Sequence, residues 1–188
     1  MSELTAAQQR LAAGIRDIQD YPKSGVLFKD ITPLLAHPEL FAEAVSVLAG
    51  VPGIGEAPAG SRFGQIDLVA GIEARGFILA APVAIALGAG FVPIRKKGKL
   101  PHATVAADYE LEYATAEIEI HTDGVLPGQR VLLVDDVLAT GGTAAAACGL
   151  LTGLGAELVA VSVLIELDFL HGRERLPGLN LNSVLHYS

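Results

Sequence analysis

Short apolar runs alternate with amphipathic or Ala/Leu-rich stretches along most of this chain. Runs of the length and composition of buried strands occur at 66–70, 91–94, 130–134 and 158–165. Helices are expected where apolar residues recur at helical spacing or dominate, at 4–18, 38–48, 77–87 and 144–154. Buried strands that alternate with helices predict an α/β fold, with a mainly parallel central sheet flanked by helices.

Other stretches have no core-forming pattern. Residues 21–33 are expected to be irregular, and 50–64 carry five glycines and two prolines, which predict a loop. Residues 183–187 form a further strand candidate. No internal repeat or linker divides the chain, so residues 1–188 are expected to form a single domain.

The segment 96–121 differs from the rest in character. Residues 96–108 are polar and are expected to be irregular, while 109–114 are expected to be partly ordered. Residues 117–121 alternate apolar and polar positions, which is typical of a half-exposed antiparallel strand.

Composition narrows the class of protein. The chain has 188 residues, of which 51% are hydrophobic, but no apolar run reaches the ~20 residues of a membrane span. The N-terminus lacks a basic segment followed by an apolar one, so no secretory signal is expected. The single cysteine, Cys148, and five histidines without paired spacing argue against disulfides and zinc. The prediction is a cytoplasmic protein without a membrane partner.

Charge is unevenly distributed. A net charge of −8 argues against nucleic acid as a partner, because nucleic-acid binders need a broad positive surface. Four of the 13 Lys and Arg residues nevertheless fall within 95–99. Such a cluster on an acidic protein indicates a local anion site, and a solvated surface run is the alternative.

The segment 131–143 is the most informative in the chain. An apolar run ends on Asp135 and Asp136, and small and hydroxyl residues follow before the next helix. Paired carboxylates can accept hydrogen bonds from the hydroxyls of a ribose, and a loop that starts a helix can bind its 5′-phosphate through backbone N–H groups. The residues expected to bind this phosphate are Ala139, Thr140, Gly141, Gly142 and Thr143.

Two familiar phosphate motifs are absent from this segment. No Lys follows the glycines, as a Walker A loop requires, and the Gly-x-Gly-x-x-Gly pattern of dinucleotide-binding folds does not occur. A purely structural role of the acidic pair in capping or turning the chain is the alternative interpretation.

The segment 131–143 closely resembles the phosphoribosyl-pyrophosphate signature of type I phosphoribosyltransferases. From about residue 15 to 166, the rest of the chain looks like the adenine phosphoribosyltransferases. The resemblance implies the type I phosphoribosyltransferase fold, with a flexible lid loop or hairpin at about 96–121 over the active site. It also implies a homodimer that salvages purines, converting adenine and phosphoribosyl pyrophosphate to AMP and pyrophosphate with Mg²⁺.

The resemblance also implies roles for particular residues. Arg75 and backbone N–H groups around Glu73 and Ala74 would bind the leaving pyrophosphate, with a non-proline cis peptide between Glu73 and Ala74. Arg95, Lys96 and Lys99 would reach the same group. Glu112 would act as acid/base near the purine imidazole, with Tyr113 packed beside it. Ala114 stands where the family usually has glycine.

Phe28 lies in an otherwise irregular segment of a chain that has only ten Phe and Tyr residues and no Trp. The residues alone leave open that Phe28 anchors the core beneath a loop. By resemblance, its ring stacks on the purine, while the backbone C=O of Leu27 and N–H of Lys29 contact the amino edge of adenine. An acceptor that faces the exocyclic amine would favour adenine over a 6-oxo purine.

The predicted catalytic residues are thus Glu112, Asp135, Asp136 and Arg75. Mg²⁺ retains water and is expected to take most ligands from the substrate, with Asp135 as the candidate protein ligand. Two other functions remain open: transfer to another base such as guanine, xanthine or orotate, and a non-catalytic ligand-binding regulator on the same fold.

Overall fold

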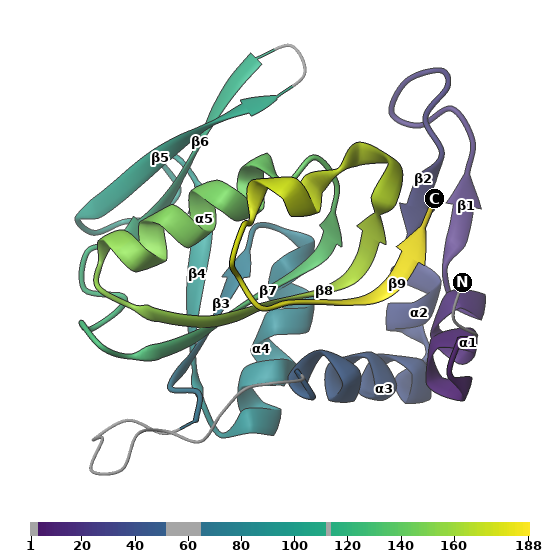
Figure 1. Cartoon of the computed structure of the whole chain (residues 1–188), viewed down its shortest axis with the longest axis horizontal. Helices are drawn as coiled ribbons and strands as arrows, with labels where there is room; N and C mark the ends of the chain where they lie inside the picture. Colours follow the sequence, from purple (N-terminus) through teal and green to yellow (C-terminus); the bar gives the residue numbers. More distant parts are fainter. Residues whose placement is uncertain (1–3, 52–64, 112–113) are drawn as a thin grey trace.

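The computed structural model describes residues 4–51, 65–111 and 114–188. Within them, the main sheet has seven strands in the order β5-β6-β4-β3-β7-β8-β9 (Figure 1). These strands are β3 (Leu68–Ile72), β4 (Gly90–Lys96), β5 (Thr104–Leu111), β6 (Ala114–His121), β7 (Arg130–Leu138), β8 (Glu157–Leu167) and β9 (Leu181–Tyr187). Pairing is parallel from β4 to β9 and antiparallel where β6 meets β4 and β5. The predicted mainly parallel sheet is confirmed.

Helices cover both faces of this sheet. The helices α1 (Ala6–Ala13), α2 (Thr32–Ala36), α3 (Pro38–Ala49) and α4 (Arg75–Leu87) lie on one side, and α5 (Gly142–Gly153) lies on the other (Figure 1). On β7, Leu132 and Val134 pack toward the first group, whereas Val131 and Leu133 pack toward α5. Burial on both faces explains why this strand is an unbroken apolar run.

The N-terminal region differs from the prediction. The helix expected over 4–18 ends at Ala13, and Gly14 caps it. A Cβ atom at Gly14 would lie 2.8 Å from Leu40 Cδ1, so the helix ends where α3 packs closely. Beyond it, β1 (Arg16–Ile18) pairs with β2 (Phe28–Asp30) in a small antiparallel sheet. The segment 21–33 is therefore only partly irregular.

The segment 96–108 is also more regular than predicted, because β5 begins at Thr104 and forms a hairpin with β6. Its inward-facing residues, Val105, Ala107 and Tyr109, pack on the core that lies under α5. The hairpin forms one edge of the main sheet and lies at the upper left of Figure 1. The antiparallel strand predicted over 117–121 is confirmed, and the action of 96–121 as a lid stays a prediction.

Strands β7 and β8 are longer than predicted and continue together past the acidic pair. Asp135 lies opposite Val163, and Leu138 lies opposite Glu166. The acidic pair therefore belongs to the end of β7 and has the fixed geometry of a strand. The last strand candidate, 183–187, is confirmed as part of β9.

Short 3₁₀ helices, η1 (Asp168–Leu170) and η2 (Gly172–Arg175), follow β8. Most of the loop predicted at 50–64 falls in 52–64, outside the described residues. None of the described helices combines the length and apolar character that a membrane span requires.

Candidate active site

A cavity of about 420 Å³ opens at the carboxyl ends of β3 and β7, the edge at which open α/β sheets bind ligands. Its wall combines segments that are far apart in the sequence. The lining residues are Val26, Leu27, Phe28, Lys29, Ile72, Glu73, Ala74, Arg75, Asp135, Asp136, Val137, Ala139, Thr143 and Leu167. The structure therefore brings most of the predicted site residues to one place.

The acidic pair forms the polar end of this cavity. Asp136 is 5% exposed, and its Oδ2 atom lies 2.7 Å from Arg75 Nε. The N–H of Arg75 does not point at this oxygen, and Oδ2 accepts no hydrogen bond from any described residue. Asp135 Oδ1 accepts from the backbone N–H of Asp136 at 2.9 Å. Burial raises the pKa of the Asp135 carboxyl, and the adjacent Asp136 carboxylate raises it further.

Residues 139–143, called here the phosphate loop, connect β7 to α5. Gly141 has a φ of +79°, a conformation that favours glycine, and α5 begins at Gly142. The N–H groups in the first turn of a helix have no acceptor within that helix and are available to an anion. Ala139 and Thr143 line the cavity, and Thr140 and Gly141 line a smaller hollow beside it. The loop thus leads into a helix N-terminus beside the cavity, and its binding of a phosphate stays a prediction.

Glu73 organises the predicted pyrophosphate-binding region. The Glu73–Ala74 peptide is cis, as the resemblance implies. Glu73 Oε2 accepts hydrogen bonds from Arg95 Nε and from the backbone N–H of Lys96, both at 3.2 Å, and Lys99 Nζ forms an ion pair with Oε1. Burial opposes ionisation of Glu73, but Lys99 and the Lys96 N–H hold the pKa of this carboxyl below its ordinary value.

The basic cluster is therefore partly paired within the protein. Arg95 and Lys99 both contact Glu73, which places them beside the cavity wall. Lys97 instead pairs with Glu117 on the hairpin and is exposed. The interpretation of 95–99 as one solvated run is too simple, because two of its cations lie against the predicted pyrophosphate loop.

Phe28 is half-buried on β2 and faces the cavity. Tyr21 packs edge-on against its ring at a centroid distance of 5.1 Å, and the Arg75 guanidinium lies 5.0 Å from the ring centre. The ammonium of Lys29 is engaged elsewhere, 2.7 Å from Asp17 Oδ1 and 3.9 Å from the Tyr187 ring centre. The side chain of Lys29 is thus engaged within the protein, and a contact of its backbone with a ligand stays a prediction.

Some predicted residues lie elsewhere, and some lining residues were not predicted. Glu112 and Tyr113 lie outside the described residues, and of Ala114 only the backbone, at the start of β6, is described. The wall of the cavity also includes Val26, Ile72, Val137 and Leu167. The first three adjoin predicted residues. Leu167 is the last residue of β8, and its position at the carboxyl end of a strand is the only sequence signal that points to a place in the cavity wall.

A model of the phosphoribosyl transferase domain family matches residues 59–177. Over 180 residues, the chain is 58% identical to the adenine phosphoribosyltransferase of Frankia alni, covering 96% of this chain and 90% of that protein. This chain belongs to the adenine phosphoribosyltransferase family. The family member from Thermobifida fusca is also 58% identical, over 170 residues that cover 90% of this chain and 92% of that protein.

Solved structures of adenine phosphoribosyltransferases have the same architecture. The one from Thermoanaerobacter pseudethanolicus superposes with a TM-score of 0.88 at 45% identity, covering 96% of this chain and 99% of that one. The one from Saccharomyces cerevisiae, complexed with D-2,5-dideoxy-2,5-imino-altritol 1,6-bisphosphate and adenine, has a TM-score of 0.85 at 38% identity, with 96% and 99% coverage. The predicted type I phosphoribosyltransferase fold is confirmed, and the individual residue roles stay predictions.

Proposed function

We propose that this chain transfers the 5-phosphoribosyl group from phosphoribosyl pyrophosphate to adenine, giving AMP and pyrophosphate. The position of Arg75 carries this proposal. Its side chain touches the Asp136 carboxylate at 2.7 Å and lies 5.0 Å from the centre of the Phe28 ring. The groups proposed to bind the ribose, the pyrophosphate and the base therefore share one cavity wall. Relatives with 52–58% identity bear the name of this enzyme.

Each part of the wall has a distinct task. Breaking the bond between C1′ and the pyrophosphate oxygen leaves positive charge on the ribose and negative charge on the leaving group. Asp135 and Asp136 hold the 2′- and 3′-hydroxyls and orient C1′ toward the purine N9. Arg75, with Arg95, Lys96 and Lys99 nearby, stabilises the leaving pyrophosphate.

Glu112 is proposed to exchange the purine imidazole proton, directly or through a water molecule. Tyr113 is proposed to pack beside it. Closure of 96–121 over the cavity would exclude water from the reaction.

The acidic pair also fits Mg²⁺. Carboxylate oxygens are ligands that this hard cation prefers, and the carboxylates of Asp135 and Asp136 both line the cavity. Mg²⁺ bound together with phosphoribosyl pyrophosphate would neutralise charge on its pyrophosphate group. We propose Asp135 as the protein ligand, with oxygens of the substrate and water completing the coordination.

Specificity for adenine is proposed to come from backbone groups beside Phe28. The ring stacks on the purine, the Leu27 carbonyl accepts from the exocyclic amine, and the Lys29 N–H donates to the ring. A 6-oxo purine would leave that carbonyl unpaired, which costs about 1–3 kcal/mol.

The test supplies the purified chain with phosphoribosyl pyrophosphate and Mg²⁺, together with adenine, hypoxanthine, guanine or orotate. The nucleotide products are then separated by chromatography. AMP from adenine with little product from the other bases is the expected result. A product from another base would overturn the specificity argument, and no product from any base would overturn the proposed activity.

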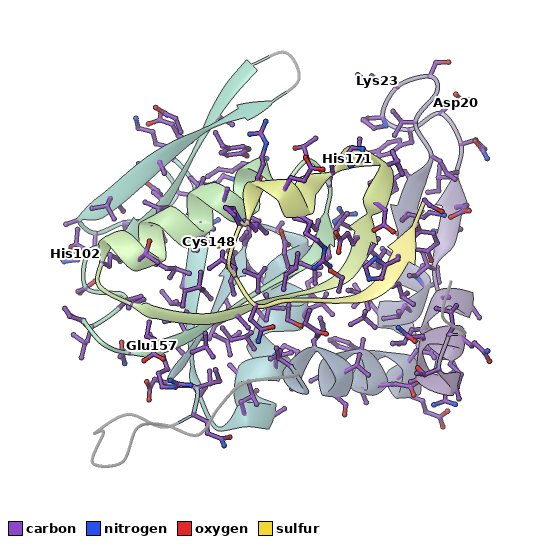
Figure 2. All side chains as sticks on the ribbon, viewed as in Figure 1. Asp20, Lys23, His102, Cys148, Glu157 and His171 are labelled. Atoms are coloured by element: carbon purple, nitrogen blue, oxygen red, sulfur yellow. The ribbon has the colours of Figure 1, made fainter. Side chains whose placement is uncertain are left out.

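We further propose a homodimer, a single domain over residues 1–188 and a cytoplasmic location. A dimer would cover Ile78 and Ile85, which lie on one face of α4, and Phe91 on β4; Ile85 is 81% exposed. Cys148, the single cysteine of the chain, lies buried on α5 (Figure 2), and a chain without an internal disulfide is compatible with a reducing compartment. Sedimentation equilibrium of the chain and of an Ile85→Glu variant tests the dimer, which this substitution should dissociate.

A further inference from the structure

The phosphate loop is in direct backbone contact with the turn that follows β8. A Cβ atom on Gly141 would lie 2.3 Å from the carbonyl oxygen of Gly172, and one on Gly172 would lie 2.2 Å from the carbonyl oxygen of Ala139. Atoms cannot approach so closely, and the neighbouring groups are backbone atoms that cannot rotate away. The two segments therefore fit only with glycine at both positions. The shape of the phosphate loop depends on where Gly172 lies.

Arg173, the next residue, fixes this turn to the sheet. Its Nε atom donates to Glu166 Oε1 at 3.0 Å, and its Nη2 donates to Oε2 at 2.6 Å. Such a bidentate pair restrains orientation as well as distance. Glu166 lies on β8 opposite Leu138, the residue before the phosphate loop. The ion pair thus joins the turn to the strand end from which the phosphate loop begins.

The Glu166 carboxylate is itself held in place. It is 4% exposed, and the Ser183 hydroxyl on β9 donates to its Oε2 atom. Arg173 Nη2 also lies 3.3 Å from Ser183 Oγ. Figure 2 shows His171 at the bend between η1 and η2, where its φ is +53°. The turn is therefore sharply bent next to a fixed carboxylate.

Arg173 contributes little to the apolar core. Half of its side-chain surface is exposed, in contrast to Leu176, which is buried in the core under α5. Neither Arg173 nor Glu166 lines the main cavity. The side-chain hydrogen bonds of Arg173 run to Glu166 and Ser183, and the adjacent Gly172 is the residue that touches the phosphate loop.

We propose that Arg173 is a positioning residue for the 5′-phosphate of the phosphoribosyl donor, acting through Glu166 and Gly172. The inference rests on the proposed function, because it takes a phosphorylated ribose as the ligand of the phosphate loop. Displacing the loop N–H groups by about 1 Å can reduce activity by as much as 10²-fold. The loss falls on the donor and leaves adenine binding nearly unchanged.

The experiment compares Arg173→Met, Arg173→Lys and Arg175→Met with the parent chain. Arg175 is an exposed arginine of the same 3₁₀ helix, and it provides the matched control. The KM for each substrate is measured together with the affinity for ribose 5-phosphate by calorimetry. Arg173→Met should raise the KM of the donor about tenfold and weaken ribose 5-phosphate similarly, while the adenine KM changes less than about twofold.

Arg173→Lys keeps the charge but not the bidentate geometry, so it should restore the donor KM only in part. Arg175→Met should behave as the parent chain. An unchanged donor KM in Arg173→Met, or equal rises for both substrates, would overturn the proposal. If Arg173→Met does not fold, Glu166→Gln provides the same comparison, because it removes the charge and keeps the size of the side chain.

Failure of the proposal and failure of the proposed function are distinguishable. Ribose 5-phosphate binding requires the phosphate loop but no catalysis. A parent chain that binds ribose 5-phosphate and makes no AMP would contradict the proposed activity alone. A parent chain that makes AMP, with an Arg173→Met variant that binds ribose 5-phosphate equally well, would contradict the positioning role alone.

Discussion

Arg75 Nε lies 2.7 Å from Asp136 Oδ2, and this contact joins the start of α4 to the end of β7. This carboxylate oxygen accepts no hydrogen bond from the described residues. Its contact with Arg75 is therefore an ion pair in which no N–H points at the oxygen. The contact therefore places the Arg75 guanidinium and the Asp136 carboxylate together in the wall of the cavity.

Asp136→Asn should lose most of the turnover and keep the fold. The amide keeps the size of the side chain but weakens the contacts with the ribose hydroxyl and Arg75, and loss of positioning at a reacting group costs about 10²-fold in rate. Steady-state kinetics and thermal unfolding measure the two effects. Asp123→Asn, at an exposed residue of the turn after β6, is the control. Near-normal turnover in Asp136→Asn would remove the proposed role.

Phe28→Ala should raise the KM of adenine far more than that of the donor. Truncation removes the stacking face of the base but none of the predicted phosphate contacts, and base–aromatic stacking is worth about 1–3 kcal/mol. Initial rates measured against each substrate give the two KM values. Phe169→Ala, at an exposed phenylalanine on η1, should leave both unchanged. Equal effects of Phe28→Ala on both substrates would make Phe28 a structural residue.

Lys99→Met should raise the KM of the donor about tenfold, because a charge-assisted contact with pyrophosphate is lost. Lys97→Met is the matched control, since Lys97 pairs with Glu117 on the hairpin and does not contact Glu73. The ratio of donor to adenine KM provides the measurement. Equal behaviour of the two variants would show that Lys99 serves only to pair with Glu73.

Asp135→Asn should stabilise the unliganded protein increasingly as the pH rises. Burial and the Asp136 carboxylate raise the pKa of Asp135 in the folded chain. Ionisation therefore favours the unfolded chain, and stability present below the ordinary pKa of about 3.9 is lost as the pH rises through the raised value.

Urea unfolding at several pH values measures this effect. The free energy of unfolding of Asp135→Asn, minus that of the parent, should grow from acid to neutral pH. Asp123→Asn should show a constant difference. A difference for Asp135→Asn that does not change with pH would contradict the account.

The sequence predicts strands that are buried on both faces and elements that a short run of neighbouring residues marks. The run at 131–134 identifies β7 because both faces of this strand are buried. The strand β5 escapes prediction because Ala107, which faces the core, stands beside an exposed alanine at 106, so the alternation of apolar and polar positions is weak. Gly14 is the one local signal for the end of α1, and its close approach to Leu40 is visible only in the folded chain.

The candidate site likewise has some parts that the sequence predicts and others that only the folded chain reveals. The acidic pair and the phosphate loop are contiguous, so their spacing alone indicates a phosphorylated sugar. The pairing of Glu73 with Lys99 and the approach of Gly172 to Gly141 join distant segments, and only the folded chain places them together. The engagement of the Lys29 ammonium by Asp17 is likewise a tertiary contact. Residue types therefore predict the chemistry, and the fold determines which groups are free to perform it.

The most direct test of the account is a crystal structure of this chain with AMP bound. We expect the adenine ring to stack on Phe28, the ribose hydroxyls to contact Asp135 and Asp136, and the 5′-phosphate to accept hydrogen bonds from residues 139–143. AMP bound outside the cavity, or bound with its phosphate away from 139–143, would contradict the assignment of the site.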